Sequence, residues 1–150
     1  MKKYRVYADT SVFGGCFDDE FAIESKQFFE SVKNGLFTLI ISPVLIAEIN
    51  EAPSNIQKIL HDLPINSLEY ISYSDDIGNL RDLYLKEKIL TVNSKSDAEH
   101  VATATIHNAD FIISWNFKHI VHYDKISGFN SVNIKNGYKL INIYSPKEVI

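Results

Sequence analysis

The chain has 150 residues, with 15 Lys and Arg against 19 Asp and Glu, and so carries a formal net charge of −4. This charge argues against a protein that coats nucleic acid through bulk electrostatics, although it leaves room for a local basic patch. The length fits one domain over residues 1–150, which would bury roughly 70% of the surface of the unfolded chain. The single Cys16 cannot form an internal disulfide, and no cysteine cluster suggests zinc.

No segment of the sequence predicts export or membrane insertion. The apolar run near the start is short and is interrupted by Arg5 and Asp9, so we expect no signal peptide. No stretch approaches the roughly 18 to 20 unbroken apolar residues of a membrane span. We therefore expect a soluble, cytoplasmic protein in a reducing compartment.

The first half of the chain alternates between strand and helix patterns. In chain order we expect a strand over residues 4–8, a helix over 20–34, a strand over 36–42, a helix that begins at Pro43 and contains VLIAEINEA, a helix over 56–63, a short strand over 68–72 and a helix over 75–88. The run LFTLIIS at 36–42 is almost continuously apolar, which is typical of a strand covered on both faces in a parallel sheet.

The second half continues the alternation. Ser96 is followed three residues later by Glu99, a capping-box pattern that predicts a helix beginning at Asp97. The run DFIISW at 110–115 predicts another buried strand, followed by a helical stretch and a last strand, YKLINIY, at 138–144. Such an alternation predicts an α/β fold built on a parallel sheet.

Four polar residues are expected to meet at the carboxyl edge of this sheet, where open α/β sheets bind ligands. Asp9 and Asn116 each come directly after a buried strand, and Asp97 begins the helix that leads to the second of these strands. Glu48 lies about a turn and a half beyond Pro43 and can project toward the same crevice. Each residue alone also has a plain interpretation, as a turn, helix-end or solvated surface residue. Their predicted convergence favours a functional site.

Three carboxylates in one crevice repel each other and favour a cation. A pair ~4 Å apart costs ~4 kcal/mol at an effective dielectric constant of about 20. Oxygen ligands without cysteine or a suitable histidine pair favour Mg²⁺ or Mn²⁺ over Zn²⁺. The amide oxygen of Asn116 would be a neutral fourth ligand or would hold a metal-bound water. A divalent ion held in this way suits phosphoryl chemistry.

These positions resemble the acidic motifs of PIN-domain ribonucleases, whose best-known members are the VapC-type toxins. The resemblance extends over nearly the whole chain and rests on Asp9-Thr10-Ser11 after the first strand, Glu48 after Ser42-Pro43, Asp97 in SDAEHVATA and Trp115-Asn116 after DFIIS. It implies a single PIN-like domain with a central parallel sheet flanked by helices in three layers, α/β/α.

The resemblance also implies a metal-dependent endoribonuclease that uses Mg²⁺ or Mn²⁺. Its catalytic and metal-binding residues would be Asp9, Glu48, Asp97 and Asn116, and Thr10 or Ser11 would help to orient a ligand or water. The reaction would be attack on an RNA phosphodiester by a water that the metal activates. Family members are usually homodimers, and a small antitoxin protein blocks the site.

The fourth acidic position departs from the common family pattern, because it is often Asp and here is Asn116. The loss of one negative charge favours one firmly held ion and leaves a two-ion mechanism open. It also motivates an alternative, a PIN scaffold with weak catalysis that binds RNA or protein. A haloacid-dehalogenase-like phosphatase fits less well, because that family places a second Asp where this chain has Ser11.

The neighbouring polar residues have no firm role. Asp110 stands at the amino end of its strand and is expected on the far side of the sheet. His100, one turn after Asp97, could hydrogen-bond a carboxylate, but we expect a partly exposed helix residue. Trp115 is expected to pack in the core or at its rim.

Basic residues beside the acidic positions are candidates for RNA binding. Lys118, with Lys95 and His119, could contact the phosphate backbone, and scattered surface charge is the alternative. His119 and His122 are spaced like a zinc pair but lack a third ligand.

Overall fold

The computed structural model describes residues 2–149, and at its centre is a five-stranded parallel sheet. The strands are β1 (Tyr4–Ala8), β2 (Phe37–Ile41), β3 (Leu68–Tyr70), β4 (Phe111–Ile113) and β5 (Ile143–Tyr144). Their order across the sheet is β3-β2-β1-β4-β5, and each neighbouring pair is parallel. Because β1 is central, its carboxyl end lies between those of β2 and β4.

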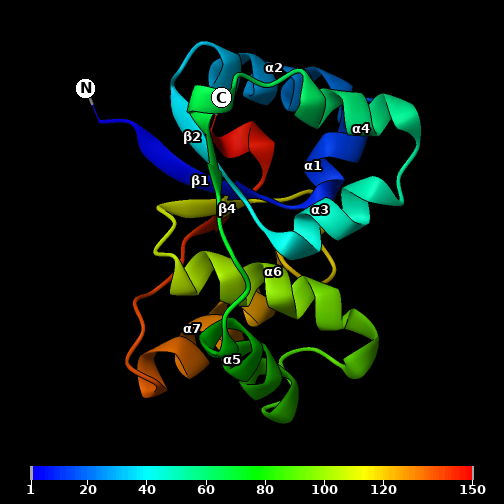
Figure 1. Ribbon diagram of the computed structural model, residues 1–150. Helices are drawn as coiled ribbons and strands as arrows, with labels where there is room; N and C mark the ends of the chain where they lie inside the picture. Colours follow the sequence, from blue (N-terminus) through cyan, green and yellow to red (C-terminus); the bar gives the residue numbers. More distant parts are fainter. Residues whose placement is uncertain (1, 150) are drawn as a thin grey trace.

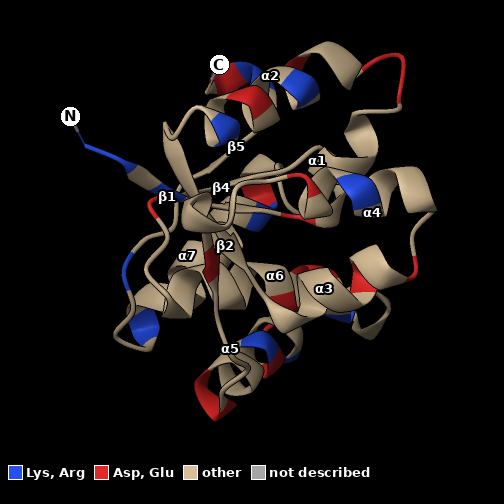
Figure 2. Ribbon diagram, turned by 45° about the horizontal axis from the view of Figure 1, so that its top comes forward, with Lys and Arg blue, Asp and Glu red and all other residues tan. Residues whose placement is uncertain are grey.

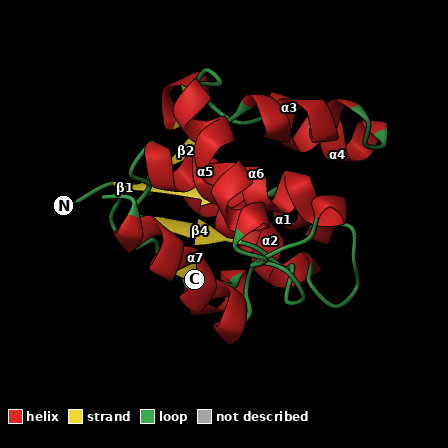
Figure 3. Ribbon diagram, turned by 90° about the horizontal axis from the view of Figure 1, so that it is seen from below, coloured by secondary structure: helices red, strands yellow, loops and turns green. Residues whose placement is uncertain are grey.

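Helices cover both faces of the sheet. They are α1 (Thr10–Gly15), α2 (Ala22–Lys33), α3 (Pro43–Asn50), α4 (Ser54–His61), α5 (Asp75–Lys86), α6 (Lys95–Ile106) and α7 (Tyr123–Lys135). One layer contains α1, α2 and α4, and the other contains α5, α6 and α7 (Figure 1). Seen from below, the second layer lies in front of β1 and β4 (Figure 3). The predicted three-layer α/β/α fold with a parallel sheet is therefore confirmed.

The central strands are buried on both faces, which explains their apolar sequences. Along β2, Leu39 and Ile41 pack in the layer of α1 and α2, whereas Ile40 packs in the layer of α5 and α6. On β1, Ala8 packs in the layer of α1 and α2, and Tyr7 packs in the layer of α5 and α6. All five side chains are fully buried. Each large apolar side chain buried in this way stabilises the fold by roughly 1.5–3 kcal/mol.

Most predicted elements are present, with ends that differ by a few residues. The first strand has the predicted bounds, and Ser42 caps α3 by accepting a hydrogen bond from the N–H of Leu45, with Pro43 in the first turn. The last predicted strand, 138–144, is reduced to Ile143–Tyr144. Its partner β4 has only three residues, and two of these pair with β5. A longer β5 would therefore have no neighbouring strand to pair with.

The capping-box prediction for α6 is wrong. The helix begins at Lys95, its N-cap Ser94 makes no side-chain cap bond, and Ser96 lies inside the first turn. The Glu99 carboxylate instead accepts a hydrogen bond from Nη1 of Arg81 at 2.6 Å, so a contact with α5 outweighs the local cap. In the described part of the chain no helix is long and apolar enough to cross a membrane.

Candidate active site

Asp9 lies at the carboxyl edge, between β1 and α1, and is only 3% exposed. Its side chain does not cap α1. Oδ1 accepts a hydrogen bond from the Ser11 hydroxyl at 2.5 Å, and Oδ2 accepts one from the Ser114 hydroxyl at 2.8 Å. Burial raises the pKa of the Asp9 carboxyl, and the charge of Asp97 raises it further, against the opposing effects of His100 and the two serines.

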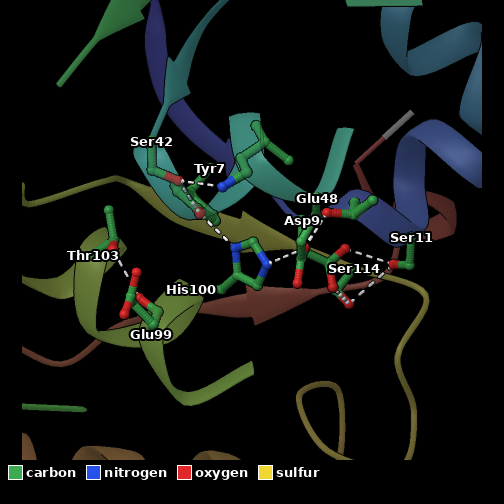
Figure 4. A network of polar contacts seen from close by, with 11 residues as sticks. Tyr7, Asp9, Ser11, Ser42, Glu48, Glu99, His100, Thr103 and Ser114 are labelled. Carbon is green, nitrogen blue, oxygen red and sulfur yellow. Dashed lines mark hydrogen bonds and ion pairs between the residues drawn. The ribbon is translucent and has the colours of Figure 1, made fainter. Parts of the chain in front are cut away.

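Glu48 projects from α3 toward the same edge. Its Oε1 accepts hydrogen bonds from the Thr10 hydroxyl and from Nε2 of His100, the latter at 2.7 Å (Figure 4). Burial tends to raise the pKa of the Glu48 carboxyl, but the hydrogen bonds from His100 and Thr10 and the charge of His100 outweigh it, so the pKa is lowered. The pKa of Glu48 is thus shifted in the opposite direction from that of Asp9.

Asp97 lies in the first turn of α6, which packs against α3. Burial raises the pKa of its carboxyl, and the charge of Glu48 adds to the increase. The positive charges of His100 and His119 and a hydrogen bond from Asn116 act in the opposite direction. The structure thus places Asp9, Glu48 and Asp97 close enough for their charges to interact.

Asn116 follows β4 and is held by the turn after the strand. Its backbone N–H donates to the Ser114 hydroxyl at 2.9 Å, and its Oδ1 accepts the backbone N–H of His119 at 2.9 Å. Since the amide oxygen already has a partner, the interaction with Asp97 belongs to the NH₂ group of the amide. The Asn116 oxygen keeps a second lone pair beyond its bond with His119.

The three expected substrate-binding residues are placed differently. Thr10 and Ser11 lie on α1 and hold carboxylates, as described above. The Ser11 hydroxyl also accepts the backbone N–H of Trp115 at 2.8 Å, which ties α1 to the end of β4. Lys118 is exposed two residues beyond Asn116. Lysine and arginine occur on helices of both layers rather than in one basic stripe (Figure 2).

Two residues of this edge were not predicted from the sequence, His100 and Tyr7. The expectation of a partly exposed His100 is wrong, because the side chain is 1% exposed and lies between Glu48 and Tyr7. Burial lowers the pKa of the imidazole, but Glu48 and the charges of Asp9 and Asp97 outweigh it and raise the pKa. Sequence spacing held a signal for both, since Tyr7 is two residues before Asp9 on a strand and His100 three residues after Asp97 on a helix.

Two residues that we expected to lie outside the site are found where the sequence predicts. Trp115 stacks on Phe21 with ring centroids 4.1 Å apart and donates its indole N–H to Ser25 at 2.7 Å, so it is a packing residue. Asp110 accepts the backbone N–H of Arg5 at 2.8 Å, at the amino end of β4 and away from the acidic edge.

The side-chain atoms at this edge are of the type that binds a hard divalent cation. The side chains that approach one another offer carboxylate oxygens, and the inward-facing Nε2 of His100 is bonded to Glu48. Burial and mutual repulsion disfavour the ionised forms of Asp9 and Asp97, and a cation would relieve both effects. Between residues 2 and 149, however, no three His, Cys, Asp or Glu side chains are gathered closely enough to hold a metal ion as they stand.

Together, the parallel sheet and its two helical layers define a three-layer α/β/α protein. No protein-family model and no curated protein sequence matches the chain. Three solved structures contain chains of similar fold, and at their low sequence identities the likeness concerns the fold alone.

The first is a toxin–antitoxin complex from Klebsiella pneumoniae, with 23% identity over 76% of this chain and 88% of that chain and a TM-score of 0.55. The second is VapBC2 from Rickettsia felis bound to a DNA fragment from its promoter, with 16% identity over 94% and 98% of the two chains and a TM-score of 0.58. The third is FitAcB from Neisseria gonorrhoeae, with 11% identity over 95% and 98% and a TM-score of 0.58.

Proposed function

We propose that this protein is a metal-dependent endoribonuclease that hydrolyses RNA phosphodiesters at the carboxyl edge of its sheet. The observation that carries the proposal is the approach of Asp9, Glu48 and Asp97 from three separate elements, near enough for each to influence the ionisation of another. Independent turn or helix-end residues have no reason to gather in this way, and isolated buried carboxylates are costly without a positive partner.

The roles of the residues follow from their contacts. Asp9, Glu48 and Asp97 would hold Mg²⁺ or Mn²⁺, which when bound activates water and neutralises charge on the phosphate. The Thr10 hydroxyl orients Glu48, and Ser11 orients Asp9.

The other two proposed site residues lie on the turn after β4. Asn116 steadies Asp97, which favours its ionised, metal-binding form. Lys118 provides a positive charge beside this edge, suited to contact the RNA backbone.

The biological role we propose is that of a toxin paired with a small antitoxin protein. The fold likeness to chains from a toxin–antitoxin complex and from VapBC2 supports this role. In this proposal one domain over residues 1–150 forms a homodimer, acts on RNA in the cytoplasm, and is silenced when the partner covers the acidic edge.

The proposal is tested by incubating the purified chain with a mixed pool of structured RNA in Mn²⁺, Mg²⁺ or EDTA. We expect cleavage with either metal and none in EDTA. Asp97→Asn should abolish cleavage, whereas Asp124→Asn should retain it, since Asp124 is an exposed acid in the first turn of α7. Cleavage that survives Asp97→Asn would count against the proposed site.

A second candidate, a binding module with weak catalysis, is favoured by one observation. Both oxygens of Asp9 are already bonded to serine hydroxyls and the Asn116 oxygen to His119, so part of the edge is satisfied without a metal. This candidate predicts retention of RNA on the protein without cleavage in either metal.

A further inference from the structure

A buried hydrogen-bonded chain runs from the start of α3 to the carboxylate of Glu48. The Ser42 hydroxyl lies 2.7 Å from the Tyr7 hydroxyl, which lies 2.5 Å from Nδ1 of His100. Nε2 of the same imidazole lies 2.7 Å from Oε1 of Glu48 (Figure 4). The first three side chains are at most 1% exposed, so the two bonds that join them are shielded from water.

The available donors and acceptors fix the direction of the bonds in this hydrogen-bonded chain. The Ser42 oxygen already accepts the backbone N–H of Leu45 at 3.1 Å, so its hydroxyl hydrogen is free to be donated to Tyr7. Tyr7 then donates its own hydrogen to Nδ1 of His100, which leaves the ring hydrogen on Nε2, facing Glu48. In the reverse direction Tyr7 would donate to Ser42, and the buried Ser42 hydrogen would have no acceptor among the contacts of the described residues.

The chain connects the three elements that carry the acidic residues. Tyr7 lies on β1, which ends one residue before Asp9; Ser42 is the N-cap of α3, which carries Glu48; and His100 lies on α6, one turn after Asp97. Among the described contacts, both donors to Glu48 bind Oε1. The three bonds that join Ser42, Tyr7, His100 and Glu48 therefore link the orientation of Glu48 to the positions of β1 and α6.

We propose that His100 is a positioning residue for Glu48, with its Nε2–H directed at Oε1 by the hydrogen bonds that Tyr7 and Ser42 make on the other side of the ring. The inference rests on the proposed function, because it assigns Glu48 to the metal site. A partner of this kind orients a metal-binding group, and its loss typically weakens metal affinity about 10- to 100-fold.

Two isosteric variants separate this role from simple packing. His100→Gln can place an NH₂ donor where Nε2 stands, whereas His100→Asn keeps a polar group near Nδ1 and loses the donor to Glu48. We expect the Mn²⁺ dissociation constant, measured by electron paramagnetic resonance of free Mn²⁺, to rise roughly 10-fold or more for His100→Asn. It should rise far less for His100→Gln. Equal Mn²⁺ affinity of folded His100→Asn and wild type, or no Mn²⁺ binding by the wild type, would overturn the proposal.

A second measurement needs no variant of His100. In ¹⁵N NMR spectra of the wild type with Mg²⁺ at mildly alkaline pH, the His100 ring should carry its proton on Nε2. Tyr7→Phe, which removes the donor to Nδ1, should give a mixture of tautomers. A wild-type ring that carries its proton on Nδ1 would refute the proposed direction of these hydrogen bonds.

These readouts also distinguish the two proposals. Tight Mn²⁺ binding with the expected tautomer but no RNA cleavage would argue against the nuclease and leave His100 in its positioning role.

Discussion

Arg5 on β1 holds Glu69 on β3 across the intervening strand β2, through contacts of 2.9 Å from Nε to Oε1 and 2.7 Å from Nη2 to Oε2. The remaining guanidinium nitrogen donates to the carbonyls of His107 and Asn108 beyond α6. One side chain thus joins the edge strand, the central strand and the turn that leads to β4.

This contact predicts a loss of stability in acid. The hydrogen bond from Arg5 lowers the pKa of Glu69 below its ordinary value of 4.5, against a smaller effect of burial. The ionised pair therefore stabilises the fold above pH 4.5, and this contribution is lost as the pH falls through the lowered pKa. Because both side chains are about one-third exposed, we expect only about 0.2–1 kcal/mol from the pair.

Thermal melts of Glu69→Gln and wild type provide the measurement. The Tm difference should be present at neutral pH and should shrink below pH 4.5. Glu87→Gln, which removes a more exposed carboxylate 3.4 Å from Lys135, serves as the control. A Tm difference for Glu69→Gln that does not change with pH would contradict the prediction.

The packing of α1 against Trp115 predicts that Gly15→Ala is destabilising. A Cβ at Gly15 would lie 2.5 Å from the Ser25 oxygen and 2.8 Å from Nε1 of Trp115, and so would force apart the bond between them. We expect a cost of about 1–3 kcal/mol, as for other overpacked cores. Trp115 is the only tryptophan of the chain, so its fluorescence should shift to the red as the indole becomes more exposed.

The neighbouring glycine is a matched control. A Cβ at Gly14 would meet only the Ile56 side chain, at 3.9 Å. Gly14→Ala should therefore leave the Trp115 spectrum unchanged, and equal effects of both variants would refute a specific clash at Gly15.

The acidic edge predicts opposite effects of Asp97→Asn with and without metal. Because burial raises the pKa of Asp97, the folded state disfavours the ionised form, and this penalty grows as the pH rises from the unfolded pKa through the folded one. Without metal at neutral pH, Asp97→Asn should therefore raise the Tm. With saturating Mn²⁺ the wild type should gain about 2.7 kcal/mol at 100 times the dissociation constant, and the variant should gain much less. A Tm that responds equally to Mn²⁺ in both proteins would exclude Asp97 from the metal site.

Lys118 predicts a change in the salt dependence of RNA binding. If its ammonium contacts one phosphate, Lys118→Ala should reduce the slope of log affinity against log salt concentration by about 0.7 for single-stranded RNA. Binding is measured by fluorescence anisotropy in EDTA, so that cleavage does not interfere. Lys86→Ala, an exposed lysine in the last turn of α5, should leave the slope unchanged. Identical slopes for Lys118→Ala and wild type would remove Lys118 from the RNA-binding surface.

The fold was largely predictable because its central strands are buried on both faces and because α3 begins at a local signal. The apolar run around Leu39 and the Pro43 that follows needed no information from the rest of the chain. The position of Asp9 and Asn116 was predictable because they follow β1 and β4, and parallel strands present their carboxyl ends at one edge.

What the sequence could not predict depends on contacts between distant segments. The short helix α1 contains two glycines and was not among the predicted elements; its Phe13 packs on Phe29 with ring centroids 4.8 Å apart. His100 is buried because α6 lies against β1, where Tyr7 meets the imidazole. Spacing relates Tyr7 to Asp9 and His100 to Asp97, but it does not show that Tyr7 and His100 contact each other. The same is true of the contact between Arg81 and Glu99.

The central position of β1 also has a consequence for biosynthesis. The first strand to leave the ribosome is the one that β2 and β4 flank, and β4 is made only after more than a hundred residues, since Ser114 is 105 positions beyond its partner Asp9. Long-range parallel pairing of this kind is slow to form. A nascent chain therefore lacks one wall of the acidic edge until β4 has been made.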